Sequence, residues 1–326
     1  MASRTLIAAA GLAVLINGAD FSARAGGSHS EARALLQELP GRPPISPLES
    51  GLLNDAADGR WDEHSLFTAA QIASGVTTEA ELLAAVLDFA ALAGDLRAKL
   101  TPAQTAEQRA IATLAFLHRR LLSGGYDLAA TELPHVFTSG RFNCVSATVL
   151  FNSLAAEVGL TVRALGMPQH TCSLLLDGDL RIRVEATCPD WFEARHRAGV
   201  VPSSITTHLG SSEDPPEVGV PISDVALVAM IYYNRGVDAL RHNDFEQAIT
   251  LNRLALALDP ENSEAKGNLL SAINKRALEL AAQRHFATAI ELVEHGLMID
   301  PNHSTLRQNR VFIDRARQHA TDHASR

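Results

Sequence analysis

The C-terminal third of the chain repeats itself, and this repetition limits the possible fold more than any other feature of the sequence. Residues 245–249, which read FEQAI, return as FATAI at 286–290, a shift of 41 residues. Residues 258–260 return at 299–301 with the same shift, and both copies end in Asp-Pro. A fixed period is typical of stacked units that each bury a hydrophobic face against a neighbour. We therefore expect two antiparallel helix pairs from Ser223 onward and a capping helix from His303 to about His319.

The repeat unit resembles the tetratricopeptide repeat. Small residues fall where paired helices touch in that family, at Gly236, Ala248 and Ala255, and Pro260 ends the second helix. The usual period is about 34 residues, so the longer spacing predicts one overlong helix over 264–283. Asn252 departs from the family pattern, which prefers an aromatic residue there, and an arbitrary pair of helical hairpins is the alternative interpretation. The resemblance implies a groove that binds a protein or peptide segment.

Length and charge limit the remaining possibilities. The chain has 326 residues, which suits two domains, and its 46% apolar and 20% charged residues are ordinary for a soluble globular protein. The formal net charge is -9, and no block of Lys or Arg stands out. This argues against a nucleic-acid footprint and against a polybasic membrane patch.

The first residues read as a secretory signal. Arg4 gives a weakly positive start, residues 6–16 form an apolar run too short to span a bilayer, and Ala23-Arg24-Ala25 offers a cleavage pattern. An Ala-rich N-terminal helix that stays with the protein is the alternative. We therefore expect an exported protein, periplasmic or extracellular. Because no Cys directly follows the cleavage pattern, we expect no lipid or membrane anchor once the signal is removed.

The middle of the chain changes from helical to strand periodicity. Apolar residues at helical spacing predict helices over 79–100 and 105–122, and a further helix is expected from Cys144 to Val158 before Gly159. Short strands are expected over 161–165, 170–176 and 180–186. Asp177-Gly178, between the last two, is a strong signal for a two-residue hairpin turn.

Cys144 follows Asn143 at the expected start of a helix. The positive end of the helix dipole favours a thiolate there, and a thiolate with a base nearby is a nucleophile. Taken alone, such a Cys is more often a small buried hydrophobic residue.

The hairpin supplies a base for this nucleophile. A turn at Asp177-Gly178 sets Leu176 opposite Asp179, and therefore His170 opposite Glu185 on the same face of the sheet. An imidazole beside a carboxylate is the base and orienting acid of a Cys-His-acid triad. The alternative is an exposed His–Glu pair with no chemical role.

These residues resemble the transglutaminase-like superfamily in order and spacing. The resemblance is carried by Asn143-Cys144-Val145-Ser146, by Met167-Pro168-Gln169-His170 and by Val184-Glu185-Ala186-Thr187, and it runs from about Asp62 to the C-terminus. It is greatest to the SirB-type bacterial branch, whose domain precedes tetratricopeptide repeats. Two departures stand out: Glu185 replaces the usual Asp, and Gln169 sits where Gly commonly precedes the His. The resemblance implies a papain-like α+β domain with catalytic Cys144, His170 and Glu185.

Further groups near the site have roles to assign. The backbone N–H of Cys144 is one natural oxyanion donor, and Asn143 is the candidate for a supporting one. The predicted register sets Cys172 and Cys188 too far apart along the strands for a disulfide. Zinc bound by the cysteines and His170 is conceivable from the ligand types, but no C-x-x-C pair supports it, so we expect neither a metal nor a cofactor.

The sequence therefore predicts an α+β fold with five parts. These are a signal peptide at 1–25, a tail at 26–61, a transglutaminase-like domain with a helical N-terminal part at 62–199, a loop at 200–221, and an all-α repeat domain at 222–326. The expected activity is cysteine-dependent acyl transfer or amide hydrolysis on a protein or peptide presented by the repeats. The alternative is a catalytically degenerate scaffold that binds a partner protein.

Overall fold

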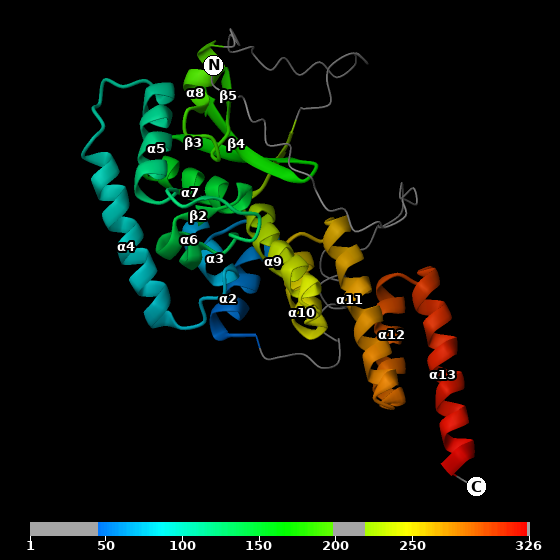
Figure 1. Cartoon of the computed structure of the whole chain (residues 1–326). Helices are drawn as coiled ribbons and strands as arrows, with labels where there is room; N and C mark the ends of the chain where they lie inside the picture. The colour runs from blue at the N-terminus through cyan, green and yellow to red at the C-terminus, as the bar shows by residue number, and fades with distance from the viewer. Residues whose placement is uncertain (1–44, 198–218, 325–326) are drawn as a thin grey trace, which may run out of the picture.

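The computed structural model describes residues 45–197 and 219–324, with side chains described as far as residue 321 (Figure 1). The predicted signal peptide lies outside the described residues, as do most of the predicted tail and most of the predicted loop. The fold is α+β, with a small sheet among helices and a helical C-terminal part, as the sequence predicts. None of the helices in the described ranges has both the length and the apolarity needed to cross a membrane.

Polar caps fix where the N-terminal helices begin. The Thr78 hydroxyl accepts the backbone N–H of Glu81, whose side chain accepts the N–H of Thr78 in return, and Thr105 and Gln108 repeat the arrangement. The elements of this part are α2 (Pro47–Asp55), the 3₁₀ turn η1 (Ala56–Asp58), α3 (Leu66–Ala73), α4 (Glu79–Arg97), α5 (Ala106–Arg120), α6 (Leu133–Ser139), α7 (Cys144–Glu157) and α8 (Trp191–Arg197).

The predicted tail over 26–61 is wrong for its last part. Ser46 and Glu49 form a capping box that starts α2, with Pro47 in the first turn. Leu52 on this helix is fully buried in the main core. Pro47 thus marks the beginning of a helix within the segment predicted to be a tail.

Four antiparallel strands form the main sheet, in the order β5–β4–β3–β6, and α7 packs against β3 and β4. A separate two-residue parallel pair, β1 with β2, lies close to the start of α7 in the chain. The strands are β1 (Gly125–Tyr126), β2 (Arg141–Phe142), β3 (Thr161–Met167), β4 (His170–Asp177), β5 (Leu180–Val184) and β6 (Val220–Ile222).

The predicted hairpin register is wrong by two residues. Asp177 pairs with Leu180, so the two-residue turn is Gly178-Asp179, with Gly178 in the left-handed region at φ 55°. His170 instead pairs with Met167 across the preceding turn, and Glu185 follows the end of β5. Because the error is an even number of residues, the same side chains still lie on the same face of the sheet.

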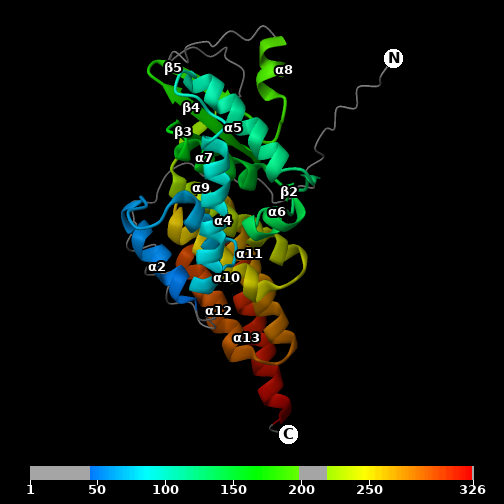
Figure 2. The same ribbon diagram turned by 90° about the vertical axis from the view of Figure 1, so that its left-hand side faces the viewer.

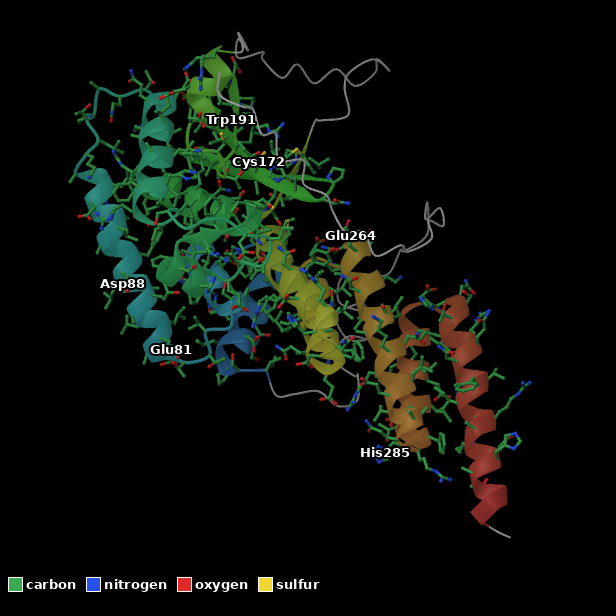
Figure 3. The ribbon with its side chains drawn as sticks, viewed as in Figure 1. Glu81, Asp88, Cys172, Trp191, Glu264 and His285 are labelled. Atoms are coloured by element: carbon green, nitrogen blue, oxygen red, sulfur yellow. The ribbon has the colours of Figure 1, made fainter. Side chains whose placement is uncertain are left out.

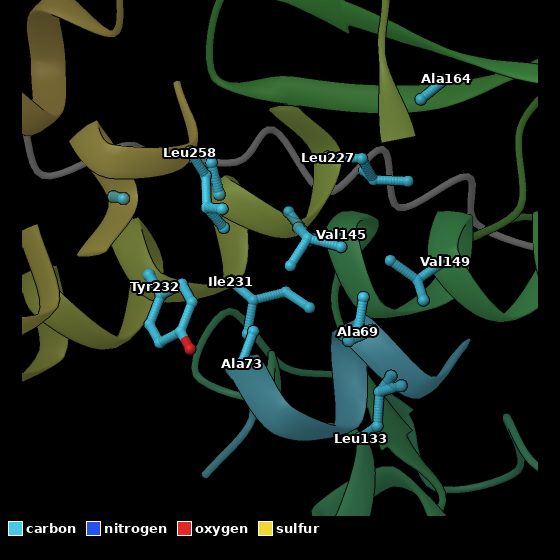
Figure 4. Packing of buried hydrophobic residues seen from close by; sticks show 14 of the residues in the cluster. Ala69, Ala73, Leu133, Val145, Val149, Ala164, Leu227, Ile231, Tyr232 and Leu258 are labelled. Atoms are coloured by element: carbon cyan, nitrogen blue, oxygen red, sulfur yellow. The ribbon is translucent and has the colours of Figure 1, made fainter. Parts of the chain in front are cut away.

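The predicted loop over 200–221 is wrong at its end, and the chain does not separate into two cores. Residues 220–222 form β6, which pairs with β3, and α9 (Asp224–Arg241) begins directly afterwards at its cap, Ser223. Helix α9 packs against α3 and α7, and Figure 2 shows α9 directly below α7. Figure 4 shows the result, with Ile231 of α9 among Ala69 and Ala73 of α3 and Val145 of α7.

Helix α9 is the first helix of the predicted hairpins, which are α9 with α10 (Phe245–Leu258) and α11 (Ser263–Ala282) with α12 (Phe286–Ile299). Helix α13 (Ser304–Ala324) follows them. The overlong helix is α11, and the capping helix α13 continues beyond the predicted end at His319. Ala248, expected at a close helix contact, and Ala289, its counterpart 41 residues later, are both fully buried.

Gly236 should be the least replaceable glycine of the repeats. A Cβ atom there would lie 2.5 Å from Nδ2 of Asn252, a fully buried side chain that also donates to the Ala248 carbonyl. We expect Gly236→Ala to lower the free energy of unfolding by about 1–3 kcal/mol. Gly267→Ala is the control, because a Cβ there meets nothing within 4 Å. Alanine should stabilise that helix by about 0.5–1 kcal/mol. Urea denaturation of both variants tests the contrast, which equal effects would refute.

Candidate active site

Cys144 is the first residue of α7, and its position is fixed by the residue before it. The Asn143 side chain accepts the Ser146 backbone N–H at 3.0 Å, which caps the helix. Its amide nitrogen donates to the Leu128 carbonyl at 3.1 Å and to the Thr131 hydroxyl. Cys144 is itself only partly buried, at the N-terminal end of the helix.

The suggested role of Asn143 as a supporting oxyanion donor is wrong. Both of its amide hydrogens are used by Leu128 and Thr131, and its backbone N–H donates to the Ser146 hydroxyl at 3.0 Å. With 2% of its surface exposed, the side chain has no donor left for a ligand. Asn143 positions the helix and the 128–131 segment rather than the substrate.

His170 begins β4 immediately after a tight turn. Gln169 lies at φ 58°, a left-handed conformation that glycine adopts without strain. Thr171, the residue after His170, anchors the turn through its hydroxyl, which donates to the Leu165 carbonyl at 2.9 Å.

Glu185 contacts His170 directly. Its Oε2 atom lies 2.7 Å from Nε2 of His170 and 3.6 Å from the Arg183 guanidinium, while its Oε1 atom accepts the Thr187 hydroxyl at 2.9 Å. The carboxylate is thus held at both oxygens, and 12% of the side chain is exposed. Since Glu185 occupies Nε2, the other ring nitrogen of His170 is the one left for the thiol.

The three predicted site residues form one hydrogen-bonded series. The hydrogen bond with Cys144, followed by the one with Glu185, raises the pKa of His170 to about 9 against the opposing effect of burial. Burial alone would raise the pKa of Glu185, but the bond and charge of His170 outweigh it and hold that pKa below its ordinary value. Both shifts favour a charged imidazolium–carboxylate pair at neutral pH.

The other two cysteines lie outside this hydrogen-bonded series. All three are free of disulfides. Burial raises the pKa of the Cys172 thiol to about 11, and burial together with Asp190 raises that of Cys188 to about 11. Both therefore stay protonated at neutral pH. Within the described ranges, no group of three or more His, Cys, Asp or Glu side chains could hold a metal ion.

Several supporting residues were not predicted. Thr187 and Arg183 flank Glu185 at spacings of two, which in an extended chain places all three on one face, and this signal was available in the sequence. His118 on α5 bonds the Ala186 carbonyl at 2.9 Å and so holds the segment that carries Glu185. Tyr126 on β1 lies within hydrogen-bonding reach of the Cys144 thiol and of its backbone N–H. No sequence pattern links Tyr126 to Cys144.

Comparisons with known protein families, with curated proteins and with solved structures find no match to this chain.

Stability should fall as the pH rises through the range in which His170 loses its proton. The folded-state pKa of about 9 lies above the ordinary value of 6.5, so the stabilisation is complete below about pH 6.5 and is lost as the pH approaches 9. Because 31% of the side chain is exposed, solvent screening limits the loss to about 1–2 kcal/mol. Urea denaturation across this pH range measures it. His170→Gln should flatten the dependence, and an equal slope in that variant would rule out His170 as its source.

Proposed function

We propose that this chain is an exported cysteine-dependent acyltransferase or amide hydrolase of transglutaminase-like type, acting on a protein or peptide. The observation that carries the proposal is the series Cys144–His170–Glu185 with the cysteine at a helix N-terminus. A nucleophile, a base and an acid that orients the base are the parts that acyl transfer needs. Export rests on the first 25 residues, and sequencing of the mature N-terminus, expected at Gly26, tests it.

The chemistry proceeds in two balanced steps. The Cys144 thiolate attacks the amide carbonyl carbon, and the carbonyl electron pair moves onto oxygen. The intermediate collapses to a thioester as the amine leaves with the proton of the His170 imidazolium. Water or an acceptor amine then attacks the thioester and gives up a proton to neutral His170. This step releases the acyl product and restores the Cys144 thiolate and the His170 imidazolium. Glu185 stays ionised and stabilises each imidazolium state.

Selective alkylation tests whether the thiol is activated. Iodoacetamide reacts with thiolates, and Cys172 and Cys188 are thiols at neutral pH. We expect one alkyl group per chain at pH 6 to 7, located on Cys144 by peptide mass mapping. His170→Gln should slow this reaction strongly. No reaction at Cys144 below pH 8 would favour the degenerate scaffold instead.

The repeats are proposed to hold the substrate. Side chains of α10, α11 and α12 line a hollow, and this lining includes the apolar Ile249, Leu280 and Leu292 as well as the charged Glu246 and Arg276. Such a surface suits a peptide segment. Figure 3 shows that α12 begins, near His285, well away from Cys172 and Trp191 in the sheet region. Under this proposal, a substrate held in the hollow is an extended segment that also reaches the cysteine site.

Trapping identifies the substrate. Incubation with a peptide library, followed by intact mass measurement, should show an acyl adduct on Cys144. Leu292→Arg should then weaken the affinity for the trapped peptide and leave the alkylation rate of Cys144 unchanged. Unchanged affinity would remove the hollow from substrate recognition.

A further inference from the structure

Tyr126 reaches the nucleophile from outside the predicted triad. Its hydroxyl lies within hydrogen-bonding reach of two groups of Cys144, the thiol and the backbone N–H. The N–H belongs to the first turn of α7, where backbone donors have no partner within the helix. One phenol oxygen thus lies beside the attacking atom and beside the natural oxyanion donor.

The backbone around Tyr126 keeps it in this position. Tyr126 pairs with Phe142 in the parallel β1–β2 pair, and the next N–H, that of Asp127, donates to the Phe142 carbonyl at 2.8 Å. The Asp127 carboxylate accepts from the Arg141 guanidinium at 3.0 Å. A Cβ atom at Gly124 would lie 2.4 Å from the Ser139 carbonyl oxygen, so the backbone segments around Gly124 and Ser139 approach as closely as glycine allows. The tyrosine is therefore anchored beside β2, the strand that leads into the Cys144 helix.

The ring has room to move although its backbone is fixed. It touches Phe142 edge-on, with ring centroids 6.1 Å apart, and 52% of the residue is exposed. Burial of the hydroxyl, with the nearby Cys144, raises the pKa of Tyr126 to about 12. The phenol thus stays protonated at any pH at which the proposed reaction runs, and it remains a hydrogen-bond donor.

We propose that Tyr126 is a catalytic residue of the proposed acyl transfer, donating the second hydrogen bond to the oxyanion beside the Cys144 N–H. In the resting site its O–H lies beside the sulfur of Cys144. When sulfur bonds to the carbonyl carbon, the carbonyl electron pair moves to oxygen and sulfur loses its charge. The O–H then turns to that oxygen, and no proton is transferred. This inference rests on the proposed function.

Two probes of the full-length chain separate this role from a structural one. Iodoacetamide alkylates sulfur by displacement at a saturated carbon, so no oxyanion forms. Acylation by p-nitrophenyl acetate passes through an oxyanion. The ratio of the two rate constants therefore isolates oxyanion stabilisation from thiolate reactivity.

Tyr126→Phe keeps the ring against Phe142 and removes only the hydroxyl. We expect the acylation-to-alkylation ratio to fall by a factor on the order of 10–10³, the range for loss of one oxyanion donor. Tyr233→Phe, at a half-buried tyrosine on α9, is the matched control and should keep the wild-type ratio.

The outcomes are distinguishable. An unchanged ratio in Tyr126→Phe, with a reactive wild type, overturns the role of Tyr126 and leaves the proposed function standing. Faster reaction with both probes also overturns it, because the hydroxyl would then be a cover over the thiol. A wild-type Cys144 that reacts with neither probe at neutral pH removes the proposed function and this inference with it.

Discussion

Cys144→Ser should abolish formation of the acyl adduct and lower turnover by a factor on the order of 10⁴–10⁶, the scale seen when a triad nucleophile is lost. A serine hydroxyl does not ionise beside an imidazole and a helix N-terminus as a thiol does. The exchange is nearly isosteric, and the cap formed by Asn143 does not involve the sulfur. Intact mass after incubation with the trapped peptide, with thermal denaturation alongside, measures both effects.

Cys188→Ser is the control for that experiment. Cys188 is also partly exposed, but its thiol donates to the Asp190 carboxylate at 3.3 Å and takes no part in the hydrogen-bonded series at Cys144. This variant should acylate at the wild-type rate. If Cys144→Ser keeps the adduct while Cys188→Ser loses it, the nucleophile has been misassigned.

Glu185→Gln should reduce turnover by a factor on the order of 10²–10⁴ while the fold remains. An amide can keep a hydrogen bond to Nε2 of His170, but it removes the negative charge that helps to keep the pKa of His170 at about 9. The imidazolium that protonates the leaving amine is then less populated. The Michaelis constant should change little, because Glu185 acts through His170 and does not touch the substrate.

Glu193→Gln, at an exposed carboxylate on α8, is the matched control and should leave turnover unchanged. The pH profile gives a second readout, since the alkaline limit of activity should move downward in Glu185→Gln as the pKa of His170 falls. Wild-type turnover in Glu185→Gln would take this carboxylate out of the mechanism.

Glu185 shows how local chemistry predicted the face of the sheet but not the register. Asp177-Gly178 and Gly178-Asp179 both satisfy a two-residue turn, and only the pairing of the whole strands decides between them. The actual register places His170 and Glu185 diagonally rather than directly opposite each other. Diagonal neighbours are about 7–8 Å apart at Cα, a gap that favours a longer side chain. The extra methylene of Glu185, a departure from the resembling family, suits this geometry.

The contacts that the sequence did not predict are those between distant segments. A strand of two residues, such as β1, has no periodicity, so nothing in the sequence places Tyr126 beside Cys144. The docking of α9 on α3 and α7 depends likewise on matching surfaces and not on any local pattern. By contrast, caps and repeats are local signals, and they predicted the start of α7 and the long helix α11 correctly.

The contacts of Thr131 determine which elements must accompany the cysteine site if it is grafted into another protein. The Thr131 hydroxyl accepts a hydrogen bond from the side chain of Asn143, which caps α7. It accepts another, at 3.2 Å, from the side chain of Asn234 on α9. Nearby, Arg235 of α9 donates to the Glu132 carboxylate at 2.7 Å and to the Ala73 carbonyl at 2.6 Å. A graft of the cysteine site into another scaffold must therefore carry α9 with it. Helices α11 to α13 make none of these contacts, so under the proposed function they are the part that a designer can exchange to redirect the chain to a new peptide.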